Sequence, residues 1–303
     1  MAVKTVQAII NGATTTLTYN SSTGKWEATI TAPSTSSYNN NDGHYYPVTI
    51  KATDEAGNVT TKNDTDTTLG NSLKLKVKEK TAPVITITYP SASALITNNK
   101  PAIAWKVTDN DSGVNSGSIK ITIDSGAAIT AGITKTAITG GYQCSYTPTT
   151  ALADGSHTIK IDASDNDGNA ASQKSVTFKI DTVPPTLNVT APAAGLITNK
   201  AACTVSGTTN DITSSPVTVT VKLNSGSAEA VSVGSDGSFS KALTLASGSN
   251  TITVVATDSA GKSTTVTRTV TLDTVAPTIK AVTLTPNPVD AGKTYVISVE
   301  VTD

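Results

Sequence analysis

The sequence predicts an all-β protein built from several sandwich domains. Thr, Ser, Val, Ile and Ala dominate the chain, and only 15% of its residues are charged. Short segments alternate apolar and polar residues and end near Gly, Asn, Asp or Pro, as half-buried strands do. Examples are residues 48–52, 118–123, 158–162 and 217–223. Since no stretch has a helical period, the strands must pack on other strands, as in a β-sandwich.

The chain also repeats itself. One turn motif occurs three times, as ATDEAGNVTT (52–61), ASDNDGNAAS (163–172) and ATDSAGKSTT (256–265). The first strand of each repeat begins at Pro83, Pro185 or Pro277, and these prolines lie 102 and 92 residues apart. That period fits one immunoglobulin-like sandwich per repeat. The sequence therefore predicts tandem immunoglobulin-like β-sandwiches in a rod-like array, with complete domains at 81–181 and 182–273.

The two remaining segments each match part of a repeat. Residues 1–80 begin at the third strand of the pattern, and residues 274–303 contain its first two strands. Their lengths, 80 and 30 residues, sum to 110, which is about one repeat. An open sandwich exposes apolar side chains and strand edges, and added strands repair both. We expect residues 274–303 of one subunit to complete residues 1–80 of another, head to tail.

The residues expected to form this inter-subunit strand pair are apolar and lie in the last 25 positions of the chain. They are Ile279, Val282, Leu284, Tyr295, Ile297, Val299 and Val301. Two alternatives stay open: the segment docks on a different protein of the same assembly, or the C-terminus is an artificial boundary of the chain.

Several segments carry a family resemblance. The runs DSGVNSGSIKITID (111–124), DGSFSKALTL (236–245) and GSNTITVVATDSAGK (248–262) resemble bacterial immunoglobulin-like (Big-type) repeats. Such repeats occur in surface adhesins and in phage and prophage tail proteins. The start MAVKTVQAIING (1–12) is similar to that of prophage-encoded Ig-like virion proteins. The resemblance implies a non-enzymatic structural protein, a tail-associated virion component or fibre. The alternative is an adhesion module that binds host-cell or mucus glycans.

Composition restricts the classes of partner and the locations that are expected for the protein. A net charge of −1 gives no basic field for nucleic acid. The sequence contains no run of 18 apolar residues that would insert in a membrane, and residues 1–5 do not start a secretory signal. We expect a virion protein assembled in the host cytoplasm. An extracellular or cell-surface location is the alternative.

Catalysis has little support in the residues. His157 aligns with Asn250 of the next repeat, so both it and His44 are interpreted as surface turn residues. No nucleophile is placed beside a base, and no cofactor is expected apart from a possible Ca²⁺. Cys144 and Cys203 fall in different repeats and are interpreted as small buried side chains without a disulfide.

Acidic turns are the candidates for that Ca²⁺. Oxygen-rich loops at domain joints bind this ion, although Asp is also common in turns without one. The candidate ligands are Asp109, Asp111, Asp165, Asp167, Asp181 and Asp273.

The aromatic residues divide into two groups. Trp26, Tyr142 and Phe239 occupy equivalent strand positions, and this equivalence predicts that they lie in the core. Tyr38, Tyr45 and Tyr46 have no aromatic counterparts in the other repeats. These three tyrosines either form a docking or glycan surface or cover the open sandwich.

Overall fold

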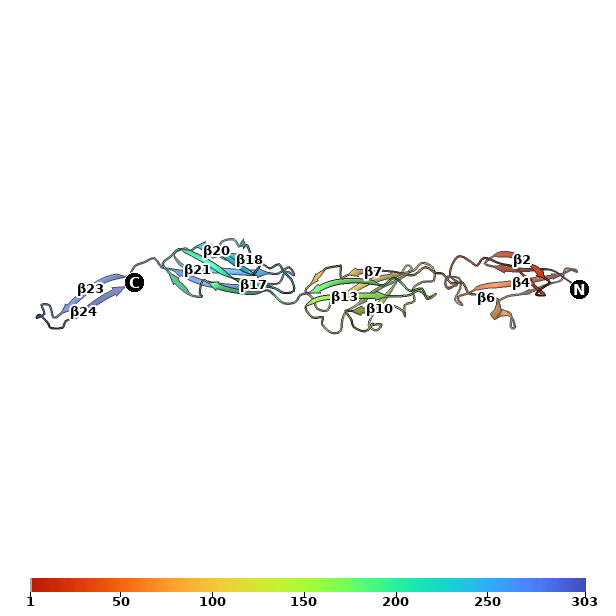
Figure 1. Cartoon of the computed structure of the whole chain (residues 1–303), viewed down its shortest axis with the longest axis horizontal. Helices are drawn as coiled ribbons and strands as arrows, with labels where there is room; N and C mark the ends of the chain where they lie inside the picture. Colours follow the sequence, from red (N-terminus) through yellow and green to blue (C-terminus); the bar gives the residue numbers. More distant parts are fainter. Residues whose placement is uncertain (1) are drawn as a thin grey trace. The chain divides into compact units, whose positions relative to one another are not determined.

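The computed structural model describes residues 2–303 and divides the chain into two compact units, up to Ile180 and from Asp181 onward. Almost all regular structure is β (Figure 1). The prediction of an all-β fold of tandem sandwiches is confirmed. Each part is described below by itself.

Residues 2–80 form a single sheet, here called the head sheet, in the order β3-β2-β1-β4-β5, with β6 paired to β4. The strands are β1 (Val3–Ile10), β2 (Ala13–Asn20), β3 (Lys25–Glu27), β4 (Tyr46–Asp54), β5 (Val59–Lys62) and β6 (Lys74–Leu75). Two short 3₁₀ helices, η1 (Ser37–Asn39) and η2 (Gly70–Leu73), lie in its loops. Asn11 and Gly12 join β1 to β2 with positive φ angles of 49° and 77°, as a two-residue hairpin turn requires.

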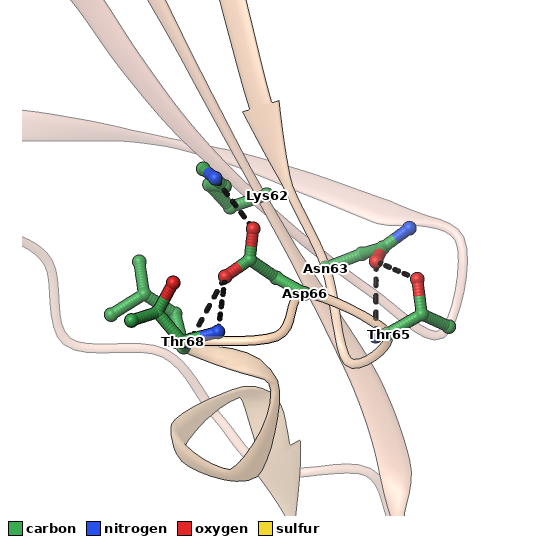
Figure 2. A network of polar contacts seen from close by, with 6 residues as sticks. Lys62, Asn63, Thr65, Asp66 and Thr68 are labelled. Carbon is green, nitrogen blue, oxygen red and sulfur yellow. Dashed lines mark hydrogen bonds and ion pairs between the residues drawn. The ribbon is translucent and has the colours of Figure 1, made fainter.

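A polar network shapes the loop between β5 and η2 (Figure 2). Asp66 accepts hydrogen bonds from the Lys62 ammonium and from the backbone N–H groups of Thr68 and Leu69. The hydrogen bond from Lys62 and those two N–H groups hold the pKa of Asp66 well below its usual range. The loop therefore has a defined path, which brings Leu73 into the small core of the head sheet.

Residues 84–180 form a complete sandwich of two sheets, β10-β13-β14-β8 and β11-β12-β9-β7. The strands are β7 (Val84–Tyr89), β8 (Leu95–Ile96), β9 (Ile103–Thr108), β10 (Lys120–Ile123), β11 (Thr134–Ile138), β12 (Gly141–Tyr146), β13 (Gly155–Asp162) and β14 (Lys174–Ile180). Alternate residues of these strands point inward, and Trp105 and Phe178 are the largest side chains fully buried in the core.

Residues 186–272 repeat this architecture with sheets β15-β17-β20 and β16-β22-β21-β18-β19. The strands are β15 (Thr186–Ala191), β16 (Leu196–Thr198), β17 (Ala202–Asn210), β18 (Thr218–Leu223), β19 (Glu229–Val231), β20 (Ser238–Thr244), β21 (Gly248–Thr257) and β22 (Ser263–Leu272). Phe239 packs among small and branched apolar side chains in this core.

The last segment is an isolated hairpin of β23 (Thr278–Thr285) and β24 (Val296–Thr302), which form their own two-stranded sheet. Thr278 pairs with Thr302, as Val84 pairs with Thr108 and Thr186 with Asn210 in the complete sandwiches. The hairpin therefore has the register of the first two strands of a sandwich.

Candidate functional site: an open sheet and an exposed hairpin

One face of the head sheet is apolar and only partly covered. Cross-strand pairing places Val6 opposite both Leu17 and Ala52, and Ala8 opposite Ile50, so these side chains share one face. The buried apolar side chains of residues 2–80 are few, namely Val6, Ala8, Tyr46 and Leu73.

Equivalent positions in a complete sandwich show what is missing. Val48, Ile50 and Ala52 on β4 correspond through the repeated turn motif to Ile252, Val254 and Ala256 on β21. The three residues on β21 are completely buried, whereas those on β4 are half-buried. The difference arises because β15, β17 and β20 cover β21 in one domain, while the head sheet has no second sheet over it.

The strand next to this opening is shortened. In the complete domain, β20 is seven residues long and pairs with β17 along its length. Its counterpart β3 has only three residues and pairs with β2 instead. Residues 28–33 continue from β3 without strand pairing, and Ile30 in this segment is exposed. Ala8, Ile10, Ile30 and Pro33 line a groove here, and residues 28–33 belong to no strand of the described chain.

The hairpin offers the complementary surface. Ile279 lies opposite Val301, Val282 opposite Val299 and Leu284 opposite Ile297, so these six predicted interface residues share one face. The seventh, Tyr295, lies just before β24 and is half exposed.

Exposure distinguishes the hairpin from its counterparts in the complete domains. Ile297, Val299 and Val301 are 56%, 50% and 52% exposed. The corresponding residues of β9, Ile103, Trp105 and Val107, are completely buried. A strand pair that forms a core elsewhere in the chain is thus in solvent here.

The three tyrosines assigned to docking or covering lie in different environments. Tyr46 is buried, with its hydroxyl 2.6 Å from that of Thr35, so its assignment to a docking surface is wrong: it covers the head sheet. The hydroxyl of Tyr45 donates to Asp64 over 2.9 Å, and this hydrogen bond raises the pKa of Tyr45. Tyr38 stacks on His44 with ring centroids 4.2 Å apart.

The aromatic positions predicted as core differ in burial. Phe239 is buried as expected, but Tyr142 and Trp26 are half-buried. Trp26 packs against Tyr19, at 5.7 Å between ring centroids. The prediction is wrong in degree for Trp26, because β3 lacks the neighbouring strands that cover Phe239.

The acidic candidates separate into two clusters and three other positions. Asp109 and Asp165 lie beside Glu79 in one cluster, and Asp181 lies beside Asp211 and Asp258 in the other. In each cluster, a carboxylate oxygen of every residue lies within 4.8 Å of those of the other two. Sequence reasoning missed Glu79, Asp211 and Asp258 as members. The signal was positional. Glu79 and Asp181 both lie four residues before a first-strand proline, Asp109 and Asp211 both directly follow a second strand, and Asp165 and Asp258 begin equivalent turns.

The other three candidate ligands lie outside these clusters. Asp111 accepts a hydrogen bond from the Ser36 N–H at 2.8 Å, and Asp167 accepts one from the Glu79 N–H at 3.0 Å. Asp273 accepts one from the Val275 N–H and is exposed.

In the cluster of Glu79, Asp109 and Asp165, burial raises the pKa of Asp109. The N–H groups of Gly113 and Asp111 oppose this shift, and the charges of Glu79 and Asp165 add to it.

His157 is the clearest correction, since it is buried and not a surface turn residue. Its Nδ1 lies 2.9 Å from Asp124 and its Nε2 lies 2.7 Å from the Ala153 carbonyl. Burial lowers the pKa of His157, but these two acceptors raise it, and the net shift is upward. The aligned Asn250 is also buried and bonds loop backbone, so the alignment was correct and the inferred exposure was not.

The cysteines follow the prediction. Cys144 and Cys203 are buried and free. Burial raises the pKa of the Cys144 thiol to about 11, which makes it inert as a nucleophile near neutral pH. Within residues 2–303, the structure contains no helix long and apolar enough to span a membrane.

Comparison with known proteins supports the repeat assignment. Residues 81–182 match the family model of a bacterial Ig-like domain, and residues 185–274 match that of glucodextranase domain B. No curated protein sequence matches.

The solved structures that match the chain come from varied sources. Domains A168–A170 of titin are 13% identical, cover 76% of this chain and 74% of their own, and give a TM-score of 0.41. The fibronectin(III)-like modules of Clostridium thermocellum CbhA are 18% identical to this chain. The match covers 63% of this chain and 94% of the CbhA chain, with a TM-score of 0.33. The family match and the two sandwiches support a bacterial Ig-like domain at residues 81–182 and a second sandwich of similar architecture after it.

Proposed function

We propose that this chain is a non-enzymatic structural protein that assembles head to tail, with the β23–β24 hairpin of one copy completing the head sheet of the next. The observation that carries the proposal is the burial contrast. Side chains that are fully buried at equivalent positions of the complete domains are half-buried in the head sheet and half exposed in the hairpin.

The two surfaces also match in strand content. A complete sandwich contains a two-strand pair, β15–β17, whose second strand pairs with β20. The hairpin supplies such a pair in the same register, and residues 24–33 of the head supply the segment equivalent to β20. Addition of β24 beside this segment gives main-chain hydrogen bonds, and the apolar face of the hairpin closes over β1 and β4.

Apolar burial supplies a substantial part of the free energy of this contact. Burying the exposed half of each of the six face residues contributes about 1 kcal/mol per side chain, or about 6 kcal/mol in total, before backbone pairing is counted. Ordering costs oppose this sum. Because the two surfaces differ, the contact is heterologous and extends into a filament unless its rotation closes a ring.

The finer proposal is a tail-associated component or fibre of a phage or prophage virion. Its support is the resemblance of residues 1–12 to prophage-encoded Ig-like virion proteins and of the repeats to bacterial Ig-like repeats, which occur in phage tail proteins as well as in adhesins. In such a protein the mechanism is mechanical, and the partner at each junction is a second copy of the chain.

A concentration series of the full chain by size exclusion with light scattering tests the assembly. We expect the mean mass to rise with concentration. A chain shortened to residues 1–273 keeps the head sheet but lacks the hairpin, so it is expected to be monomeric alone and to shorten assemblies of the full chain when mixed with it. A full chain that stays monomeric throughout, or that is unaffected by the shortened chain, refutes the proposal.

A further inference from the structure

Three aspartates gather at one end of the 186–272 sandwich. Asp181 precedes β15, Asp211 directly follows β17, and Asp258 begins the turn between β21 and β22. Their exposed fractions are 0%, 8% and 6%, and a carboxylate oxygen from each lies within 4.8 Å of the others. The cluster thus joins the segment that leads into the domain to two of its loops.

Backbone groups hold each carboxylate in place. One oxygen of Asp211 accepts from the N–H groups of Thr213 and Ser214, both at 2.8 Å. Oδ1 of Asp258 accepts from the Lys262 N–H at 2.9 Å, and Oδ1 of Asp181 accepts from the Val183 N–H at 3.3 Å. The three side chains are therefore fixed before any ligand binds.

Two of the buried oxygens are left without a partner. Oδ2 of Asp181 and Oδ2 of Asp258 are both inaccessible to solvent and accept no hydrogen bond. Buried carboxylate oxygens are normally paired, because an unpaired one loses its hydration without compensation. The deficit calls for a donor or a cation among these three side chains.

Comparison with the other turns explains why the deficit occurs here. Asp54 and Asp165 begin the equivalent turns, and in each the second oxygen accepts from the side-chain amide of an Asn four residues later, Asn58 or Asn169. Lys262 stands at that position after Asp258. The turn at Asp258 is thus the one of the three whose acidic residue lacks an amide partner.

No protein cation balances the cluster. The ion pairs of residues 2–303 involve Asp66, Asp124 and Glu229, and none of the three clustered aspartates. Carboxylates this close, removed from water, repel one another unless a positive charge lies among them. A cation from solution would supply that charge.

We propose that Asp181, Asp211 and Asp258 bind a calcium ion. The donors are all oxygen, which favours a hard cation over zinc or copper. Oxygens within 4.8 Å of one another can bind a single Ca²⁺, whose bonds to oxygen are about 2.4 Å long. Mg²⁺ gives up its waters reluctantly, so a site made of buried carboxylates suits it less. The ion would tie residues 181–185 to the loops after β17 and β21. This site does not depend on the proposed assembly.

Calcium titration of the chelator-treated full chain, followed by calorimetry and peptide-level hydrogen exchange, tests the proposal. We expect calcium to slow exchange in peptides covering 181–185, 211–216 and 258–262. Asp181→Asn and Asp258→Asn keep the side-chain shape and should each weaken binding at least tenfold and remove this protection. The control Asp236→Asn, at an exposed turn of the same domain, should leave both unchanged.

Each alternative result has a defined meaning. Absence of calcium binding at millimolar concentration overturns the proposal, and so does binding whose protection pattern survives both Asn variants. If calcium has no effect while Asp258→Asn alone raises the melting temperature, the cluster shares protons and is not a metal site. Protection confined to peptides around Glu79, Asp109 and Asp165 would assign calcium to the other cluster and also refute this proposal.

Discussion

Val299 offers the sharpest test of the hairpin interface. It lies in the middle of β24, is 50% exposed, and corresponds to the fully buried Trp105 of β9. Completing its burial on assembly contributes about 1 kcal/mol. Val299→Asp removes this contribution and places a carboxylate in the new core, where desolvation costs several kcal/mol more. A combined loss of about 4 kcal/mol weakens association by about a thousandfold.

The neighbouring residue supplies a matched control. Ser298 points to the opposite face of β24, since successive side chains alternate across a strand. Ser298→Asp introduces the same charge and is expected to change association by no more than about twofold. Sedimentation velocity over a concentration series measures both variants against the parent chain. If both substitutions weaken association equally, or if neither does, the burial of one face of β24 in the contact is refuted.

Three further predictions follow from particular contacts. Because the pKa of His157 is raised on folding, its contact with Asp124 stabilises the protein below about pH 6.5, the ordinary value, and this stability is lost as pH rises through the folded pKa. Because Asp124 is partly exposed, Asp124→Asn should lower the free energy of unfolding at low pH by about 1 kcal/mol or less, as measured by thermal melts at several pH values. A variant whose stability depends on pH as the parent's does would contradict this role of the His157–Asp124 contact. Trp26 should become buried on assembly. In a Trp105→Phe chain Trp26 is the remaining tryptophan, so its fluorescence emission should shift to the blue as the protein concentration rises. Constant emission in a chain that still assembles would place the contact elsewhere. Gly207→Ala should lower the melting temperature by several degrees, because its Cβ would lie 2.2 Å from a backbone carbonyl of β15, and a neutral result would show that the two strands can separate at no cost.

The sequence predicted the fold class well because the repeat is regular. The turn motif at 52–61 aligns with later copies, and from that alignment the strands of residues 1–80 and the missing pair could both be inferred. The burial of individual polar residues could not be predicted in the same way. His157 aligns with Asn250, a polar residue interpreted as exposed, but its burial depends on Asp124, which lies 33 residues away in the sequence and contacts it only after folding.

The acidic clusters show the same limit. Asp181 was recognised because it lies at a joint, whereas Asp211 and Asp258 are separated from it by 30 and 77 residues and meet it only at the end of the folded sandwich. Their spacing along the chain does not predict that the three carboxylates lie side by side in the folded domain. Alignment of the three repeats could have indicated it, since the same three strand ends carry acidic residues in both complete domains.

The equivalence of these positions has a consequence for the junction between copies. Asp273 lies four residues before Pro277, Asp303 directly follows β24, and Asp54 begins the turn after β4. These are the three positions that form an acidic triad in each complete domain, here divided between the hairpin and the head sheet. A junction built as proposed would bring Asp273 and Asp303 of one copy to Asp54 of the next. Because Asn58 already donates to the second oxygen of Asp54, the two added carboxylates would act there mainly by mutual repulsion, and the ionic strength of the medium would then act on the cohesion of the polymer itself, link by link.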